Sequence, residues 1–256
     1  MSVLLRSPGL APILATLDTV AAQRGPAVVH GLTPGLVVED PTGWLPAEAF
    51  TTGAALPDLL DAAYQRWGAG PAAAAALAWK SYAYWLTLPA VVGYATARRI
   101  PDMSAGNVLV RLHVAAPFLE IGLRTPRVAV TPGDRLAGRP GVAVVDDLPG
   151  YLRRTLVDGH LGAVLDGLHR LVRVGRRTLL GSLASAVAYS LTRSADALPG
   201  PIAPTAATLL TALGVEPLVE ITPQLRVQRR TCCLAFTLPE PKICAGCCVP
   251  TSSDLP

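Results

Sequence analysis

The first 231 residues of this 256-residue chain contain no cysteine, and all five cysteines fall between positions 232 and 248. A secreted domain cross-linked by disulfides would spread its cysteines through the fold and would not normally leave one cysteine unpaired. Charged residues are also scarce, at 16% of the chain against 51% hydrophobic residues, whereas disorder requires the opposite balance. The sequence therefore predicts a globular fold whose cysteines serve one local site.

Two further absences exclude other classes of protein. The formal net charge is only +4, and the sequence lacks the dense basic stripe that nucleic-acid binding requires. Only two of the 22 basic residues are lysines, a bias typical of GC-rich codon usage rather than of a function. No glycine-rich dinucleotide fingerprint and no phosphate-binding loop occur, so no motif for a nucleotide cofactor is present.

The opening 25 residues lack the unbroken apolar stretch and the cleavage site of a signal peptide, because Pro12 and Asp18 interrupt them. Helical spacing instead predicts an amphipathic helix with four apolar residues on one face: Leu10, Ile13, Leu14 and Leu17. We therefore expect a cytoplasmic protein.

A second candidate for a membrane segment is the apolar stretch 71–97. Lys80 lies inside it, Pro89 interrupts it, and the charge-free part, 81–97, has the minimum length that spans a bilayer. We interpret it as a buried core helix, or as two helices that meet at Pro89. Loose attachment to the inner face of a membrane stays open.

The pattern of segments predicts an α+β protein. We expect a loop-like region over 25–52, a helix over 56–67, and further helices from Pro149 onward, the last over 205–213. Short stretches rich in branched residues predict a central antiparallel sheet of three to four strands, flanked by the helices: 108–113, 118–123, 127–130 and 142–145. We divide the chain into an α+β domain over 1–220 and a C-terminal metal-binding segment over 221–256.

The cysteines follow the pattern Cys-Cys, ten residues, Cys-x-x-Cys, with Cys248 as a spare next to the last one. A zinc site of four cysteines usually uses two knuckles, and only Cys244 and Cys247 form one here. Cys232 and Cys233 point to opposite faces of an extended strand, so the backbone must bend for both to reach one site. A [2Fe–2S] cluster offers two separate corners and accommodates such a pair more easily. The spacing favours iron–sulfur over zinc, and zinc stays open.

Other polar residues have simpler interpretations. His30, His113, His160 and His169 are isolated, and isolated histidines are usually hydrogen-bonded structural groups. The pair Asp146–Asp147 precedes Pro149 and is typical of a helix cap. Arg229 and Arg230 adjoin the cysteine pair, where they are either ordinary solvated charges or residues that attract a substrate.

The stretch Arg229-Arg230-Thr231-Cys232-Cys233-Leu234, followed after ten residues by Cys244-Ala-Gly-Cys247, resembles the C-terminal signature of the FhuF-like ferric-siderophore reductases. A weaker likeness lies at residues 172–191, where Leu180-Gly181-Ser182 stands in place of the family's frequent Trp-Gly-Asn. The resemblance implies that Cys232, Cys233, Cys244 and Cys247 ligate a [2Fe–2S] cluster. It also implies a cytoplasmic enzyme that reduces the ferric ion of a siderophore by one electron.

We expect the substrate to be a ferric siderophore of the hydroxamate type, because hard oxygen donors hold Fe(III) far more tightly than Fe(II). We expect a monomer that receives its electron from a separate donor, such as a ferredoxin or a flavin reductase. Two other functions stay open: a zinc-stabilised binding or biosynthetic module without redox activity, and an iron–sulfur carrier that serves another protein.

Overall fold

The computed structural model describes residues 7–113 and 115–249. The ends of the predicted domains, at residues 1–6 and 250–256, lie outside the described residues, as does residue 114. The fold is α+β, as predicted.

Its α-helices are α2 (Ala11–Arg24), α3 (Glu48–Thr51), α4 (Leu56–Trp67), α5 (Pro71–Ala97), α6 (Leu148–Leu152), α7 (Gly162–Val172), α8 (Arg176–Ser194) and α9 (Ile202–Leu213). Its other helical turns are η1 (Pro26–Val28), η2 (Ala105–Asn107), the π-helical η3 (Arg153–Leu161), η4 (Ala195–Ala197), η5 (Glu216–Leu218) and η6 (Ala235–Thr237).

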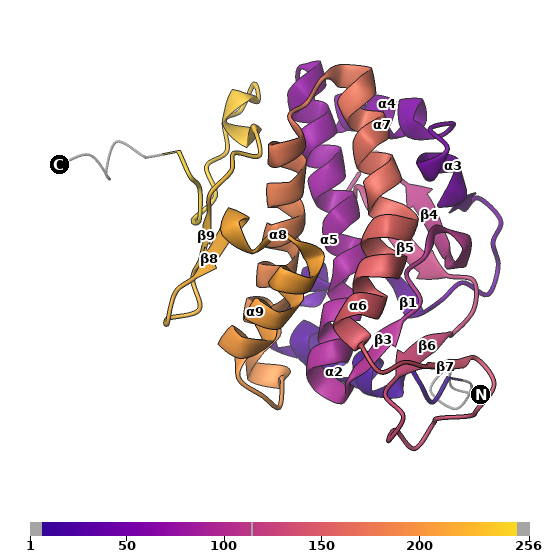
Figure 1. Ribbon diagram of the computed structural model, residues 1–256. Coiled ribbons are helices and arrows are strands. Elements are labelled where there is room, and N and C mark those ends of the chain that lie inside the picture. Colours follow the sequence, from indigo (N-terminus) through magenta and orange to yellow (C-terminus); the bar gives the residue numbers. More distant parts are fainter. Residues whose placement is uncertain (1–6, 114, 250–256) are drawn as a thin grey trace.

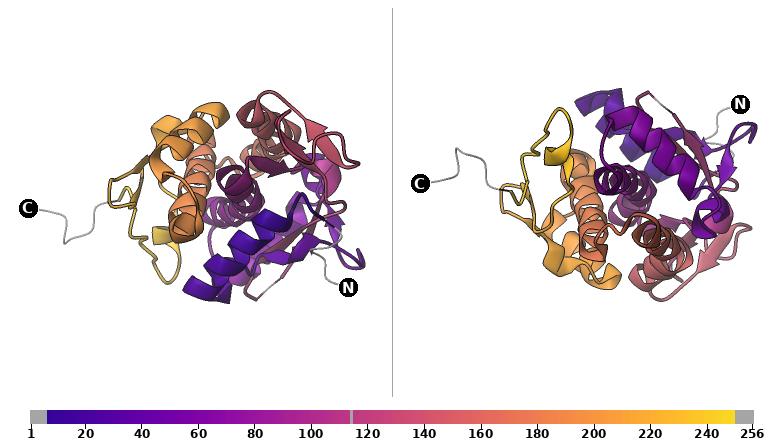
Figure 2. Two further views of the ribbon diagram at one scale, coloured as in Figure 1. Left: turned by 90° about the horizontal axis from the view of Figure 1, so that it is seen from below. Right: turned by 90° about the horizontal axis from the view of Figure 1, so that it is seen from above.

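Helix α5 is the centre of the molecule (Figures 1 and 2). Seen along its axis in Figure 2, it is surrounded by α2, α4, α7, α8 and the strands. Most of its side chains are buried, including the bulky Trp79 and Tyr82. It runs through Pro89 as one helix, so it is the buried core helix that the sequence predicts. Among the described helices, none is long and apolar enough to cross a membrane.

Helix α8 packs along α5 and lies between much of α5 and the C-terminal segment (Figure 1), although the segment still reaches α5 at Lys80. The Trp79 indole NH of α5 donates a 2.7 Å hydrogen bond to the Leu179 carbonyl of α8. The middle of α8 is rich in small buried residues, which allow close approach on both sides: Gly181, Ser182, Ala184, Ser185, Ala186 and Ala188. This helix is therefore the platform on which the cysteine-bearing segment rests.

The sheet prediction is correct for one strand pair and wrong in its arrangement. Strands β4 (Val108–Leu112) and β5 (Leu119–Leu123) pair antiparallel, as expected. The sheet is not purely antiparallel, because β1 (Leu32–Val37) adds in parallel to β5, while β2 (Leu45–Pro46) closes the other edge beside β4. The segment 25–52 is thus not only a loop. Its strand escaped prediction because Pro34 and Gly35 interrupt the alternation.

The other two expected strands do not join this sheet. Strands β6 (Val128–Val130) and β7 (Val142–Val144) pair in parallel, and β3 (Arg99–Pro101) pairs antiparallel with β6 in a separate sheet. Neither sheet is central, because both lie to one side of α5 (Figure 1). Local sequence sets the strand tendency, whereas the choice of partner depends on distant contacts.

The helix predictions are confirmed closely. Helix α4 covers the predicted range 56–67, and α9 ends at Leu213 with Gly214 in the left-handed conformation. Asp147 caps α6, with its carboxylate accepting a 2.9 Å hydrogen bond from the Gly150 amide. The apolar face expected for the opening helix is buried: Leu10, Ile13, Leu14 and Leu17.

The last described part of the chain lies on the outer face of α8 (Figure 1), and one end of it also contacts α5. Strands β8 (Val219–Ile221) and β9 (Val227–Arg229) form a two-stranded antiparallel ribbon against α8. The cysteines follow this ribbon in a segment of turns and η6. The predicted boundary between residues 220 and 221 falls inside β8.

Candidate metal centre

The backbone bends directly after the adjacent cysteines. Leu234 has a positive φ of 61°, and η6 begins at the next residue. This turn brings the Leu234 amide to 3.2 Å from the Cys232 sulfur, while the Ala235 amide donates to the Cys233 sulfur. Both sulfurs thus receive a backbone N–H, and such donors stabilise a thiolate. The bend that the sequence requires at this pair is present.

The second cysteine pair lies on a tight turn that is held against β9. The Cys247 amide donates to the Cys244 carbonyl at 2.9 Å, and the Val249 amide lies 3.4 Å from the Cys247 sulfur. Gly246 is pressed against the ribbon, because a Cβ there would lie 1.8 Å from the Val227 carbonyl oxygen. Its own carbonyl accepts a 2.9 Å hydrogen bond from the Arg229 amide, which fixes the turn beside the first pair.

One cysteine of each pair meets the other across the site. The thiols of Cys233 and Cys244 hydrogen bond to each other, which lowers the pKa of Cys233 and raises the pKa of Cys244. The Lys80 ammonium of α5 lies 3.7 Å from the Cys244 sulfur and favours its thiolate. The spare Cys248 is partly buried, and burial is the main cause that raises the pKa of its thiol.

Arg229 is buried beside the cysteines, with 2% of its surface exposed. One of its nitrogens, Nη2, donates to the Ser182 hydroxyl of α8 at 3.2 Å. Its Nε and Nη1 find no hydrogen-bond partner within the described part of the chain, and no carboxylate there pairs with it. The positive charge of Arg229 favours the thiolates of Cys233 and Cys244. A buried guanidinium with two free donors requires an anion.

The role predicted for the two arginines needs correction for Arg229. A side chain that is 2% exposed has no surface for a docking substrate to contact, so its charge can act on the site only from within. Arg230 is exposed and forms a 3.2 Å ion pair with Glu220 of β8. Arg229 is the last residue of β9 and Arg230 follows it, so the alternation of the strand turns the two side chains to opposite faces.

The four predicted ligands fit a sulfur-bound group, although they are not gathered around one point. Among residues 7–113 and 115–249, no three His, Cys, Asp or Glu side chains are close enough to hold a single metal ion. The fit rests instead on the donor set: four free cysteines, one N–H donor to each sulfur, and the unpaired guanidinium of Arg229. This is the environment that a negatively charged, thiolate-ligated metal group requires.

A cleft of about 620 Å³ opens directly at Cys244. Its walls come from α4, α5, α8 and the loop before β5, and the segment of Cys244 and Ala245 completes it. The volume lies in the range typical of small-molecule sites. Aromatic and basic side chains face it: Trp67, Tyr84, Trp85, Phe118, Tyr189, Arg66, Lys80 and Arg193.

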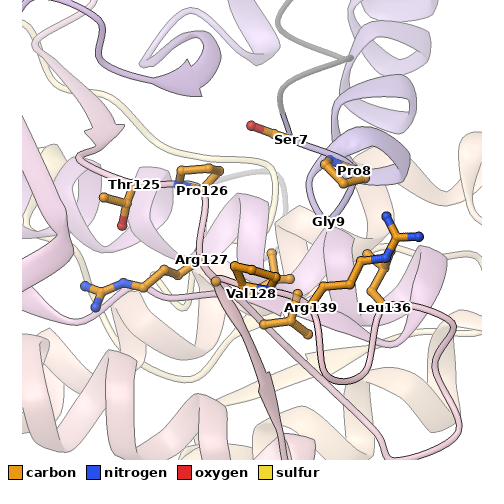
Figure 3. Close-up of a pocket in the computed structure, with 12 residues that line it drawn as sticks. Ser7, Pro8, Gly9, Thr125, Pro126, Arg127, Val128, Leu136 and Arg139 are labelled. Carbon is orange, nitrogen blue, oxygen red and sulfur yellow. The ribbon is translucent and has the colours of Figure 1, made fainter.

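A second hollow, of about 510 Å³, has no cysteine in its lining (Figure 3). It lies between the start of α2 and the strands β6 and β7, on the side of the molecule opposite the C-terminal segment (Figures 1 and 3). Arg127 and Arg139 border it, and Arg127 pairs with Asp102 at 3.3 Å. It shares no residue with the cysteine site.

The histidines are placed as structural groups. His160 is fully buried between Tyr82, whose hydroxyl lies 2.6 Å from Nε2, and the Met103 carbonyl, 2.9 Å from Nδ1. Burial lowers its pKa to about 4, so it stays neutral. His169 contacts the Val174 carbonyl at 2.8 Å, and His113 lies 3.6 Å from Glu120. His30 lies against Trp85 at the edge of the cleft.

Sequence reasoning missed Lys80 and Ser182 as parts of the site. Lys80 is the only charged residue of α5, and a lone charge in an apolar core helix was the available signal. Ser182 lies in the three-residue stretch where the chain departs from the family it resembles, and it bonds Arg229. Comparison of the chain with protein-family models and with curated proteins finds no match.

Proposed function

We propose that this protein is a ferric-siderophore reductase of the FhuF-like kind that works in the cytoplasm. Cys232, Cys233, Cys244 and Cys247 would hold a [2Fe–2S] cluster, which supplies one-electron reducing chemistry when bound. The observation that carries the proposal is the buried Arg229 with two unpartnered donors beside four free thiols.

The electrostatic argument starts from the cost of burying a charge. An unpaired ion inside a protein is penalised by several kcal/mol, so a buried guanidinium occurs with a counter-charge. The described carboxylates do not supply one to Arg229. The Cys233 thiolate is one neighbouring anion, and a [2Fe–2S] group with four thiolates, which is a dianion when oxidised, would supply a larger counter-charge from the same side chains.

The contact between Cys233 and Cys244, one residue from each cysteine pair, supports two irons over one zinc ion. Tetrahedral zinc with bonds of about 2.3 Å requires all four sulfurs within about 4 Å of one another. In the described chain Cys233 meets Cys244, whereas no three cysteines form a common group. A two-iron cluster needs its thiolates only in two pairs, one at each end.

Residues around the site have defined tasks in this function. Lys80 and Arg229 neutralise charge that grows on reduction, and the amides of Leu234, Ala235 and Val249 hold the sulfurs in orientation. The cleft at Cys244 would hold the substrate, a siderophore-bound ferric ion, within a short distance of the site. The product is Fe(II), which hard oxygen donors bind weakly and release.

The electron would come from a separate donor, such as a ferredoxin or a flavin reductase. Two exposed apolar side chains close in sequence to the cysteines, Phe236 and Ile243, support contact with another protein. The same surface suits the rival function of an electron carrier, and the zinc-stabilised module is the other rival.

Stopped-flow mixing tests the reductase function directly. The chemically reduced protein is mixed with ferric siderophores, and its reoxidation is followed by the return of visible absorption. We expect rapid reoxidation with release of Fe(II), trapped by a ferrous chelator. Failure to reoxidise with any ferric chelate, while oxidised ferredoxin reoxidises the protein, would assign it instead as a carrier.

A further inference from the structure

The cleft at Cys244 carries charge of one sign. Arg66 of α4, Lys80 of α5 and Arg193 of α8 line it, and no described Asp or Glu does. Arg66 and Arg193 are exposed, and neither forms an ion pair within the described chain. Three cations from three helices around one hollow create a positive potential, which attracts anionic ligands.

The same cleft presents aromatic faces. Trp67 lies 4.6 Å from Phe118 between ring centroids, and Tyr84 lies 4.9 Å from Trp85. The Arg193 guanidinium is stacked over Tyr84 and Tyr189, at 5.4 and 4.9 Å from their centroids. Aromatic rings and a planar guanidinium in one wall favour a ligand that is itself aromatic.

Lys80 connects the cleft to the cysteine site, because it lines the cleft and contacts the Cys244 sulfur at 3.7 Å. Cys244 lies in the wall as well, so a ligand in the cleft would touch a proposed cluster ligand. The place where a ligand binds and the place where the electron leaves would then be adjacent.

From charge, aromatic lining and adjacency we infer that the cleft binds an anionic ferric chelate whose iron-binding groups are aromatic, phenolates or catecholates. This inference rests on the proposed function and specifies its substrate class. It differs from the hydroxamate substrate that the resemblance suggests. Three hydroxamates leave a ferric complex neutral, whereas three catecholates leave it strongly anionic, and only the latter gains from Arg66, Lys80 and Arg193.

Binding is tested apart from electron transfer by using gallium(III), which has the charge and size of ferric iron but is not reduced. Calorimetric titration of the purified, metal-loaded protein compares three complexes: gallium tris-catecholate (anionic, aromatic), gallium tris-benzohydroxamate (neutral, aromatic) and gallium tris-oxalate (anionic, not aromatic). We expect the catecholate to bind at least tenfold more tightly than either of the others.

Variants locate the binding. Arg66→Gln should weaken catecholate binding about five- to tenfold and leave benzohydroxamate binding unchanged. Arg193→Gln removes a stacked guanidinium as well as a charge, so it should weaken binding of both aromatic complexes, and that of the catecholate more. Arg170→Gln, which removes an exposed arginine of α7 outside the cleft, is the matched control and should change neither affinity.

Equal affinities for the three complexes, tighter benzohydroxamate than catecholate binding, or equal effects of Arg66→Gln and Arg170→Gln would each overturn the inference. None of these binding results contradicts the reductase function. That function is retained if the reduced protein still reduces ferric hydroxamates. Conversely, a protein that holds zinc but binds gallium catecholate through Arg66 retains the cleft assignment and loses the reductase function.

Discussion

At the scale of single residues, Arg229 and Arg230 show how neighbours in sequence acquire different roles. Arg229 points inward to Ser182 and the cysteines, and Arg230 points outward to Glu220. Low effective dielectric strengthens the field of the buried charge, and solvent screens the exposed one. The two arginines therefore form a natural matched pair for measuring what a buried cation does to the site.

We predict that Arg229→Met lowers the midpoint potential of the proposed cluster by on the order of 50–100 mV, because a buried positive charge favours the reduced, more negative form. Redox titration followed optically measures the shift. Arg230→Met, the control, should shift the potential by much less because its charge is exposed and ion-paired. Equal shifts for the two variants would contradict the account of the buried charge.

His160 gives a prediction for pH dependence. Its pKa is lowered to about 4 by burial, against 6.5 for an ordinary histidine, so only the unfolded chain takes up this proton between those values. The free energy of unfolding therefore falls as pH decreases through 6.5, and the loss levels off near pH 4. Between pH 7 and pH 5 this single group should cost about 2 kcal/mol.

The measurement compares urea unfolding of the wild type and His160→Gln at pH 7 and at pH 5. The variant is expected to be less stable at pH 7, because its contacts with Tyr82 and Met103 change. Its free energy of unfolding should change less between pH 7 and pH 5 than that of the wild type. A variant that loses as much stability as the wild type on acidification would show that His160 does not titrate as burial requires.

At the scale of elements, α8 positions the cysteine segment through close backbone approach. Gly181 faces Thr231, the residue before the cysteine pair, and a Cβ at Gly181 would lie 1.7 Å from the Thr231 hydroxyl oxygen. Ser182, next along α8, bonds Arg229. The stretch that bears the weaker family likeness is therefore the surface that receives the segment.

Gly181→Ala should displace the segment from α8 and lower the free energy of unfolding by about 1–3 kcal/mol, as overpacking does in cores. Iron content per chain should fall with it. Gly200→Ala is the control, because its Cβ would meet open space and its backbone conformation is ordinary. Normal iron content and stability in Gly181→Ala would contradict the role of this contact.

Some helices and strands could be predicted from the sequence, and others could not. Helices such as α4 and α9 are predictable because their apolar spacing and glycine ends are local signals. Strand β1 was missed because proline and glycine hide it, and the parallel pairing of β6 with β7 depends on contacts that spacing does not encode. The clustering of the cysteines is visible in the sequence, and their role as ligands stays a prediction; the burial of Arg229 and the cleft were not predictable. The cleft joins α4, α5 and α8, which meet only in the fold.

At the scale of the whole molecule, the cysteine segment is a peripheral layer on a core built around α5 (Figure 1). The core of helices and sheets buries its own apolar side chains, whereas the segment has little regular structure after β9. A bound metal stabilises mainly those parts of a fold that have little packing or regular structure of their own. In this chain that part is the cysteine segment.

Removal of the proposed metal group by a chelator should therefore loosen the segment without unfolding the core. Hydrogen exchange of the metal-loaded and metal-free proteins is expected to differ most at residues 230–249 and on the outer face of α8, with α5 unchanged. Loss of protection throughout α5 on metal removal would mean that the segment is not a separate layer.

The proposed iron–sulfur site is tested most simply by the visible spectrum of the purified protein together with its iron, zinc and inorganic sulfide content. Four-cysteine ligation of a [2Fe–2S] cluster predicts a red-brown protein with bands between roughly 400 and 550 nm and equal iron and sulfide. Cys232→Ser should abolish the bands, and Cys248→Ser, which alters the spare cysteine, should retain them. A colourless wild-type protein with one zinc per chain would contradict the account.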